Sequence, residues 1–278
     1  MAGGLGYPCL LVAGVAGVGL ALGSDFSLAA SKAAPANPLM VGAAVSLIEP
    51  LRALAPSFAK AQKLPTPIFN FASSGVLQKQ IQKGAPIDVF VSAAQKQMDA
   101  LDRAGLLLPG SRRDILSNDL VLVVPADGNL RIFSIPGLTA DSVRRVAIGD
   151  SSVPAGDYAR QVLFFFGLSD ALQGKLVPLG SVRAVANAVA AGDVDAGFVY
   201  RSDVQNVANL RIVLAAPPKS YQPIFYSAAV IKSSVQPQQA KAYLSSLTTL
   251  QASQLFKRYG LIPLSLVGVT SGAKSGTK

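Results

Sequence analysis

The chain has 278 residues, half of them hydrophobic and only 14% charged, a composition that buries a large core and fits two lobes of ordinary size. It contains no histidine and a single cysteine, Cys9, which excludes a metal site of the His/Cys type and a Ser-His-Asp or Cys-His catalytic pair. The net charge of +10 attracts anions, but the basic residues are scattered and have few aromatic neighbours. We therefore expect no nucleic-acid partner.

The N-terminal segment predicts export. Residues 10–22 read LLVAGVAGVGLAL, which is about the length of a signal-peptide core and too short for a comfortable membrane span. Small residues follow, and cleavage is expected after Ala30, Ala34 or Ala36. A retained N-terminal anchor is the alternative. Residues 1–37 are therefore assigned to a signal peptide and linker, and the mature protein is expected in the periplasm.

Strand and helix patterns alternate in the first part of the mature chain. The expected strands are residues 38–44, 66–71 and 87–92. An amphipathic helix with Leu47, Leu51, Leu54, Ala55 and Phe58 on one face follows the first strand. Two more helices, residues 75–83 and 95–104, stop at glycines. This alternation predicts a mostly parallel sheet with helices on both faces.

The same pattern continues to residue 259. The expected strands are residues 120–124, 145–149, 196–200, 210–214 and 226–231. The expected helices are residues 157–166, 182–191, 238–247 and 251–259. These segments form a second set of strand and helix units, and the last fourteen residues show no pattern.

Four loops place small hydroxyl residues or glycines where a strand leads into a helix. They are AAVSL (43–47), FASSGVLQKQI (71–81), GDSSVPAGDYA (149–159) and DAGFVYRSDV (195–204). A helix N-terminus offers unpaired backbone N–H groups and partial positive charge, and both suit an anion. Ligands of open α/β sheets bind beyond the carboxyl ends of the strands. Together, the loops predict a polar cradle rich in hydrogen-bond donors.

Each loop also has a purely structural interpretation. Ser46 and Glu49 have the spacing of a capping box, in which Ser46 caps its own helix. Residues 73–75 fit an ordinary cap and turn, and residues 153–156 a turn with proline near a helix start. Tyr200 fits a half-buried aromatic of a strand.

In their order along the chain, these segments resemble the molybdate-binding proteins of ABC transporters, a family of periplasmic solute-binding proteins. The matching segments are AAVSL, FASSGVLQKQIQKGAPIDVFVSA, NDLVLVVP, GDSSVPAGDYA, GFVYRSD and FKRYGLIP. The resemblance covers residues 39 to about 264 and implies a two-lobe periplasmic-binding-protein fold of the α/β class. Lobe one is expected at 38–118 plus 227–266 and lobe two at 119–226, with hinge crossings near 119–124 and 225–230. Residues 267–278 are expected to form a mobile tail.

The resemblance also implies a binding site and partners. The implied ligand contacts are Ser46, Ser74, Ala93, Ala155, Val182 and Tyr200, in which serine and tyrosine give hydroxyls and the others mainly backbone N–H groups. The GDSSVPAG loop is one residue shorter than the usual pattern of the family. The implied ligand is molybdate or tungstate, and the implied partner is an ABC transporter permease with its ATPase. No cofactor, no protein-bound metal cation and no enzymatic activity are expected, and the protein is expected to be a monomer.

The chemistry of these positions fits a fully ionised oxyanion. None of them is Lys or Arg, so neutral dipoles would hold the dianion. Monohydrogen phosphate carries a proton that needs an acceptor, and a buried donor without one costs about 1–3 kcal/mol. Sulfate is smaller and cannot contact all donors at once.

Three alternatives remain open at this point. The first is a protein of the same fold that binds another oxyanion, such as sulfate or phosphate. The second is a hydrolase with Ser73 or Ser74 as nucleophile and Lys79 or Lys83 as base. The third is a structural or membrane-anchored envelope protein without a working site.

Overall fold

The computed structural model describes residues 37–264 except Asn129 and Asn206. The chain divides into two units, residues 1–35 and 36–278, and the described residues all belong to the second. The predicted signal peptide and C-terminal tail lie outside the described residues. Within the described part, no helix combines the length and apolar character that crossing a bilayer requires.

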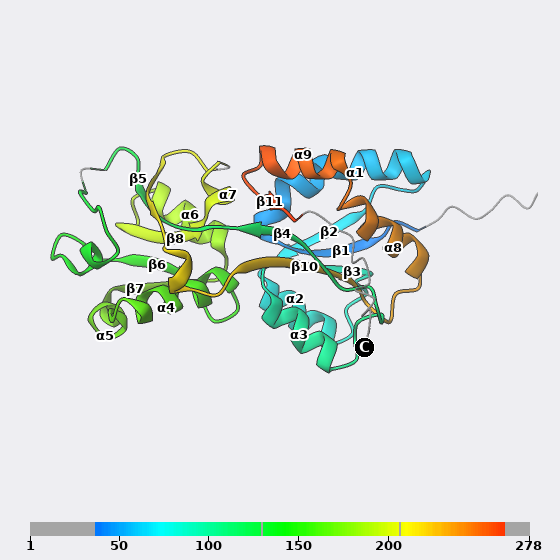
Figure 1. Cartoon of the computed structure of the whole chain (residues 1–278), viewed down its shortest axis with the longest axis horizontal. Helices are drawn as coiled ribbons and strands as arrows, with labels where there is room; N and C mark the ends of the chain where they lie inside the picture. The colour runs from blue at the N-terminus through cyan, green and yellow to red at the C-terminus, as the bar shows by residue number, and fades with distance from the viewer. Residues whose placement is uncertain (1–36, 129, 206, 265–278) are drawn as a thin grey trace, which may run out of the picture. The chain divides into compact units, whose positions relative to one another are not determined.

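Two β-sheets form the framework of the described unit (Figure 1). The first contains, in spatial order, β11 (Ile262–Pro263), β4 (Arg113–Asn118), β10 (Ile224–Val230), β3 (Val89–Ser92), β1 (Met40–Ala44) and β2 (Ile68–Ala72). The second contains β7 (Leu176–Leu179), β6 (Val146–Gly149), β8 (Ala196–Tyr200), β5 (Leu120–Pro125) and β9 (Leu210–Ala215). Together with the helices around them, these sheets confirm the two-lobe α/β fold.

Both sheets are mixed, so parallel pairing is less dominant than the sequence suggested. β1 runs parallel to β2 and β3, and β6 runs parallel to β7 and β8. In contrast, β10 is antiparallel to β3 and β4, and β5 is antiparallel to β8 and β9. The parallel strands lead into helices, whereas β4, β5 and β10 adjoin the segments that carry the chain from one sheet to the other.

Helices cover both sheets. Those with the first sheet are α1 (Ile48–Gln62), α2 (Ser74–Gln82), α3 (Gln95–Arg103), α8 (Pro237–Ser246) and α9 (Leu250–Arg258). Those with the second are α4 (Pro154–Phe165), α5 (Ser169–Leu172), α6 (Val182–Ala190) and α7 (Arg201–Val204). In Figure 1, α1 and α9 lie on one face of the first sheet, with α2 and α3 on the other. The predicted apolar face of α1 is buried, because Leu51, Leu54 and Phe58 pack into the core.

The chain changes sheet twice. β4 ends at Asn118 in the first sheet and β5 begins at Leu120 in the second, so the first change falls on Asp119. The return falls in residues 216–223, between β9 and β10, slightly before the expected residues 225–230. β4 and β10 pair side by side at this passage (Figure 1). Both crossings are therefore short segments of backbone beside paired strands.

Candidate functional site

A small cavity lies where the predicted loops meet. It is lined by Ala44, Val45, Ser46, Ser73, Ser74, Ala93, Val153, Pro154, Val182 and Tyr200. Five of the six predicted contacts are among them, and the sixth, Ala155, follows the lining residue Pro154 and is itself fully buried. The cavity volume is about 10 Å³, about the space of one water molecule. None of these lining residues carries a charge.

The topology explains why these residues meet. Ala44, Ala93 and Tyr200 stand at or just beyond the carboxyl ends of β1, β3 and β8. The 3-10 helix η1 (Val45–Leu47) and helices α2, α4 and α6 all begin at the cavity wall. Strand ends and helix starts from both sheets therefore surround one point, as the sequence predicted.

Ser46 does not cap its helix. The residue at the N-cap of α1 is Leu47, and no side chain caps either η1 or α1. Instead, the Ser46 hydroxyl lies 3.1 Å from the Tyr226 hydroxyl and is almost fully buried. The capping-box interpretation is therefore wrong, and Ser46 is held by a residue far away in the sequence.

Ser74 and Ala93 interact directly. The Ala93 N–H donates to Ser74 Oγ at 3.0 Å, so the serine oxygen accepts a hydrogen bond from the protein. Among the described residues, nothing accepts the hydroxyl proton of Ser74, and the side chain lines the cavity. Ser74 is thus arranged as a donor. The Ala93 N–H, expected to reach an anion, orients Ser74 in this structure.

Two helices beside the second sheet, α4 and α6, begin at the cavity. Val182 is the first residue of α6, and the Ser181 hydroxyl satisfies the Ala184 N–H at 3.1 Å. Ala155 is the second residue of α4, where Pro154 has no N–H to offer. The first N–H groups of a helix have no partner inside it, so those of Val182 and Ala155 are available to an anion.

The glycine of the VPAGDYA motif has a packing role. A Cβ added at Gly156 would lie 2.0 Å from the Gly149 carbonyl oxygen, closer than any real contact. Only glycine allows the start of α4 to approach the end of β6 in this way. Gly156 thereby brings the N-terminus of α4 to the cavity.

The cavity has two sides, the first formed by elements of the first sheet and its helices and the second by elements of the second sheet and its helices. Tyr200 connects these two sides. Its hydroxyl donates to the Ala93 carbonyl oxygen at 3.4 Å, and its ring lies 5.8 Å from the ring of Tyr226. Burial raises the pKa of Tyr200 well above its usual value, so its hydroxyl stays protonated as a donor. Tyr200 is 1% exposed, and the half-buried strand aromatic is therefore not what the structure shows.

Close contacts hold the two sides together around the cavity. The Gly75 N–H donates to the Ser152 carbonyl oxygen at 3.0 Å, and the hydroxyls of Ser73 and Ser152 lie 3.0 Å apart. A Cβ at Gly75 would lie 2.6 Å from that carbonyl oxygen. Residues 73–75 are therefore more than a cap and turn, because they form a contact between the two sides.

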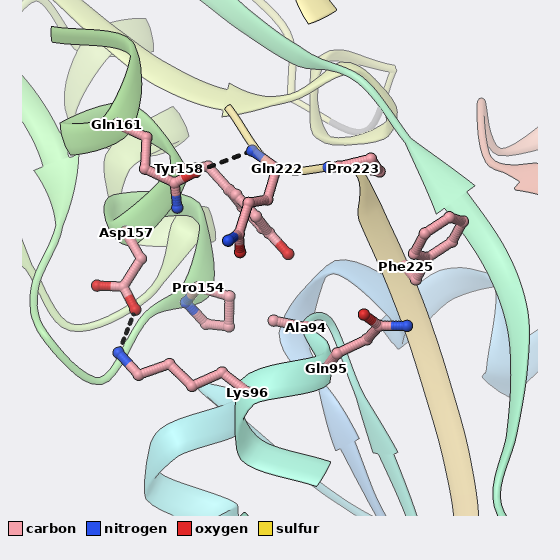
Figure 2. Close-up of a pocket in the computed structure, with 10 residues that line it drawn as sticks. All are labelled: Ala94, Gln95, Lys96, Pro154, Asp157, Tyr158, Gln161, Gln222, Pro223 and Phe225. Carbon is pink, nitrogen blue, oxygen red and sulfur yellow. Dashed lines mark hydrogen bonds and ion pairs between the residues drawn. The ribbon is translucent and has the colours of Figure 1, made fainter. Parts of the chain in front are cut away.

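Two ion pairs also join the two sides. Arg183 of α6 lies 2.9 Å from Glu49 of α1. Figure 2 shows the second pair, in which Lys96 of α3 reaches Asp157 of α4 at 2.7 Å. This pair edges a larger cavity of about 260 Å³ that also includes Tyr158 and Gln222. Charged groups thus lie outside the small cavity rather than in its wall.

Sequence reasoning missed three buried polar residues behind the wall. Asn118 and Tyr226 support Ser46, and Asp203 accepts the Tyr200 N–H at 3.2 Å. Burial raises the pKa of Asp203 to about 7, against the lowering effect of Arg183. Asp203 stands three residues after Tyr200 in the YRSD segment, which is the only local signal that pointed to it.

The lining residues include no base for a serine hydrolase. Ser73 and Ser74 line the cavity, but Lys79 and Lys83 are exposed residues of α2 and its C-cap and do not. No group of three or more His, Cys, Asp or Glu suited to a metal ion occurs among the described residues. The arrangement can donate hydrogen bonds from several directions, as an anion requires.

Comparisons with known proteins agree with this geometry. The profile of the bacterial extracellular solute-binding protein family matches residues 39–262. The molybdate-binding protein ModA of Escherichia coli is 34% identical over 85% of this chain and 93% of its own. The periplasmic molybdate-binding protein of Azotobacter vinelandii has a TM-score of 0.72 at 30% identity, covering 81% of this chain and 98% of its own. The substrate-binding domain of a putative molybdenum ABC transporter from Clostridium difficile has a TM-score of 0.65 at 37% identity, covering 82% and 99%.

Proposed function

The chain belongs to the family of bacterial extracellular solute-binding proteins, and we propose that it captures molybdate or tungstate between its two lobes and delivers it to an ABC transporter permease. The family resemblance expected from the sequence is confirmed. Members of this family bind solutes, and the chain is a binding protein rather than an enzyme.

The observation that carries the proposal is a cavity whose lining residues carry no charge, at which serine hydroxyls and the starts of α4 and α6 meet. Ser46 and Ser74 supply hydroxyls from the first sheet, and Ala155 and Val182 supply backbone N–H groups from the second. Hydrogen bonds to a charged group are roughly twice as strong as neutral ones, so several of them hold a dianion without a counter-ion. Because each lobe fixes its own donors in advance, little side-chain ordering is needed when the lobes close on the ligand.

The same donors explain the choice of ligand. An unprotonated oxyanion accepts hydrogen bonds on every oxygen, whereas the proton of phosphate would face another donor, at a cost of about 1–3 kcal/mol. Several relatives that are at least 30% identical to this chain are named for molybdate. Tungstate has the same charge and nearly the same size, so it belongs to the same proposal.

Binding requires the two lobes to part and close. A cavity of about 10 Å³ has no room for a four-oxygen anion to enter, so the ligand enters an open form. We assign lobe one to residues 38–118 plus 227–266 and lobe two to 119–226, with the hinge at the two crossings. A ligand that contacts both lobes favours the closed form, which the permease then recognises.

Delivery to a transporter implies export. We propose that removal of the signal peptide leaves a periplasmic monomer that begins between Ser31 and Asn37 and docks on a permease with its ATPase. N-terminal sequencing of the protein from its native host tests the cleavage. An intact Met1 on a membrane-bound protein would contradict it.

Thermal unfolding with four anions tests the ligand class. Molybdate or tungstate at a hundredfold excess over its dissociation constant should stabilise the mature protein by about 2.7 kcal/mol. Sulfate should stabilise it less, and phosphate hardly at all. The strongest stabilisation by sulfate would assign the protein to another oxyanion, and equal stabilisation by phosphate would contradict the donor-only site.

A further inference from the structure

A chain of buried hydrogen bonds runs from the first sheet crossing to Ser46. Its members are Asn118, Tyr226 and Ser46, and each is at most 4% exposed. Asn118 is the last residue of β4, beside the point at which the chain leaves the first sheet, and Tyr226 lies in the neighbouring strand β10. These hydrogen bonds therefore connect the crossing to a wall of the binding cavity.

The direction of these hydrogen bonds is set at Asn118. Its side-chain oxygen accepts the Asp119 N–H at 2.9 Å, which fixes which end of the amide is oxygen and which is nitrogen. The amide nitrogen then donates one hydrogen to Ser202 Oγ at 2.8 Å and the other to Tyr226 Oη at 3.2 Å. An amide nitrogen only donates, so Tyr226 must accept here.

Because Tyr226 accepts from Asn118, the direction of its hydrogen bond with Ser46 is also fixed. Asn118 and Ser46 are the only described hydrogen-bond partners of its hydroxyl. If Tyr226 also accepted from Ser46, its own buried proton would have no partner, which costs about 1–3 kcal/mol. Burial also raises the pKa of Tyr226, so the proton remains on the oxygen. Tyr226 therefore donates to Ser46 Oγ at 3.1 Å.

We infer that Asn118 and Tyr226 are positioning residues that make Ser46 a donor to the anion and thereby set selectivity against protonated oxyanions. With its oxygen accepting from Tyr226, Ser46 directs its own proton into the cavity that it lines. Ser46 is then poorly placed to accept the proton of phosphate. This inference rests on the proposed function, because it concerns the same anion site.

Calorimetry of Tyr226→Phe tests the inference. The variant keeps the buried ring against Tyr200 and removes only the hydroxyl. Without its donor, Ser46 rotates freely and can accept as well as donate. Affinity for molybdate should fall roughly tenfold, and the ratio of the phosphate to the molybdate dissociation constant should fall with it. A loss of folding alone would not change that ratio.

A double-mutant cycle shows whether Tyr226 acts through Ser46. Once Ser46→Ala has removed the hydroxyl, adding Tyr226→Phe should not weaken molybdate binding further. Tyr243→Phe is the matched control, since Tyr243 is also fully buried and its hydroxyl has no hydrogen-bond partner within the described part of the chain. This control should bind molybdate as the unaltered protein does.

The possible outcomes separate this inference from the proposed function. If the unaltered protein binds no molybdate, the proposed function fails and the inference fails with it. If it binds molybdate but Tyr226→Phe has unchanged affinity and selectivity, the inference alone is overturned. Additive effects of the two substitutions would also overturn it, because Tyr226 would then act independently of Ser46.

Discussion

In the proposed site, the two sides of the cavity use different kinds of donor. On the first side, Ser46 and Ser74 present hydroxyls that can turn, and their direction is fixed by Tyr226 and by the Ala93 N–H. On the second side, Ala155 and Val182 present backbone N–H groups that the helices α4 and α6 hold in place. Side-chain donors thus need supporting residues elsewhere, whereas backbone donors need only the helix. Ligand affinity should therefore depend on the residues that support the hydroxyls of the first side. On the second side it should depend on the positions of the helices α4 and α6.

The largest effect should follow from keeping the two sides apart. In Gly75→Ala, the new Cβ would lie 2.6 Å from a backbone oxygen of Ser152, which cannot move aside as a side chain can. Because the closed form is then strained, affinity for molybdate should fall by about a hundredfold or more.

Calorimetry measures that loss, and small-angle scattering should show no compaction of the Gly75→Ala variant on adding molybdate. Gly174→Ala serves as the control, since its added Cβ meets nothing within 4 Å. If Gly75→Ala binds and compacts like the unaltered protein, the contact between Gly75 and Ser152 is not part of the closed form.

The next largest loss of molybdate affinity should follow from removing a hydroxyl on the first side of the cavity. Ser46→Ala and Ser74→Ala each delete one donor to a charged ligand, which should weaken binding about 10- to 150-fold. Stability should fall by about 1–3 kcal/mol for Ser46→Ala, because the buried Tyr226 hydroxyl loses its acceptor, although no helix cap is lost. Calorimetry and thermal unfolding measure both effects. Unchanged affinity in both variants would remove these serines from the site.

Asp203, which supports Tyr200 from behind the cavity wall, makes the stability of the protein depend on pH. The pKa of Asp203 is about 7 in the folded protein and near its ordinary 3.8 in the unfolded chain. Between these values the folded form holds a proton that the unfolded form has lost. Stability should therefore fall as the pH rises from about 3.8 to about 7.

Asp203→Asn should flatten this dependence by removing the carboxyl group while keeping an oxygen to accept the Tyr200 N–H. The melting temperature of the unaltered protein should fall by a few degrees more than that of the variant over the same range. Asp170→Asn, at an exposed position, is the control. A variant with an unchanged pH profile would show that Asp203 is ionised throughout.

The smallest change in molybdate affinity should follow from removing an ion pair outside the cavity wall. Lys96 is 69% exposed, so water and salt screen its attraction to Asp157. Lys96→Ala should therefore change molybdate affinity by no more than a few-fold. A loss as large as that of Ser74→Ala would mean that closure depends on surface charge rather than on the cavity donors.

Local patterns sufficed for much of the fold and for the cavity wall. The apolar periodicity of α1 and the helix-ending glycines Gly84 and Gly105, both at positive φ, predicted elements close to those observed. The four loops with hydroxyl or glycine residues at strand ends contain eight of the ten residues that line the cavity, and the family resemblance added Ala93 and Val182. Both kinds of signal are local, since each depends on residues within one or two turns of one another.

The supporting residues could not be predicted in this way. Ser46 and Tyr226 are 180 positions apart, and no local pattern pairs them. β4 was missed because its sequence, RDILSN, is mostly polar, although its pairing with β10 is extensive. These features depend on which strands become neighbours at the crossings, and periodicity carries no such information.

The most direct test of a donor-only site is a calorimetric titration of the mature protein with molybdate in the presence of a large excess of phosphate. If every cavity group donates, phosphate should leave the apparent affinity for molybdate essentially unchanged. A fall in apparent affinity in proportion to the phosphate concentration would mean that the site accepts a protonated oxyanion, and it would contradict the account.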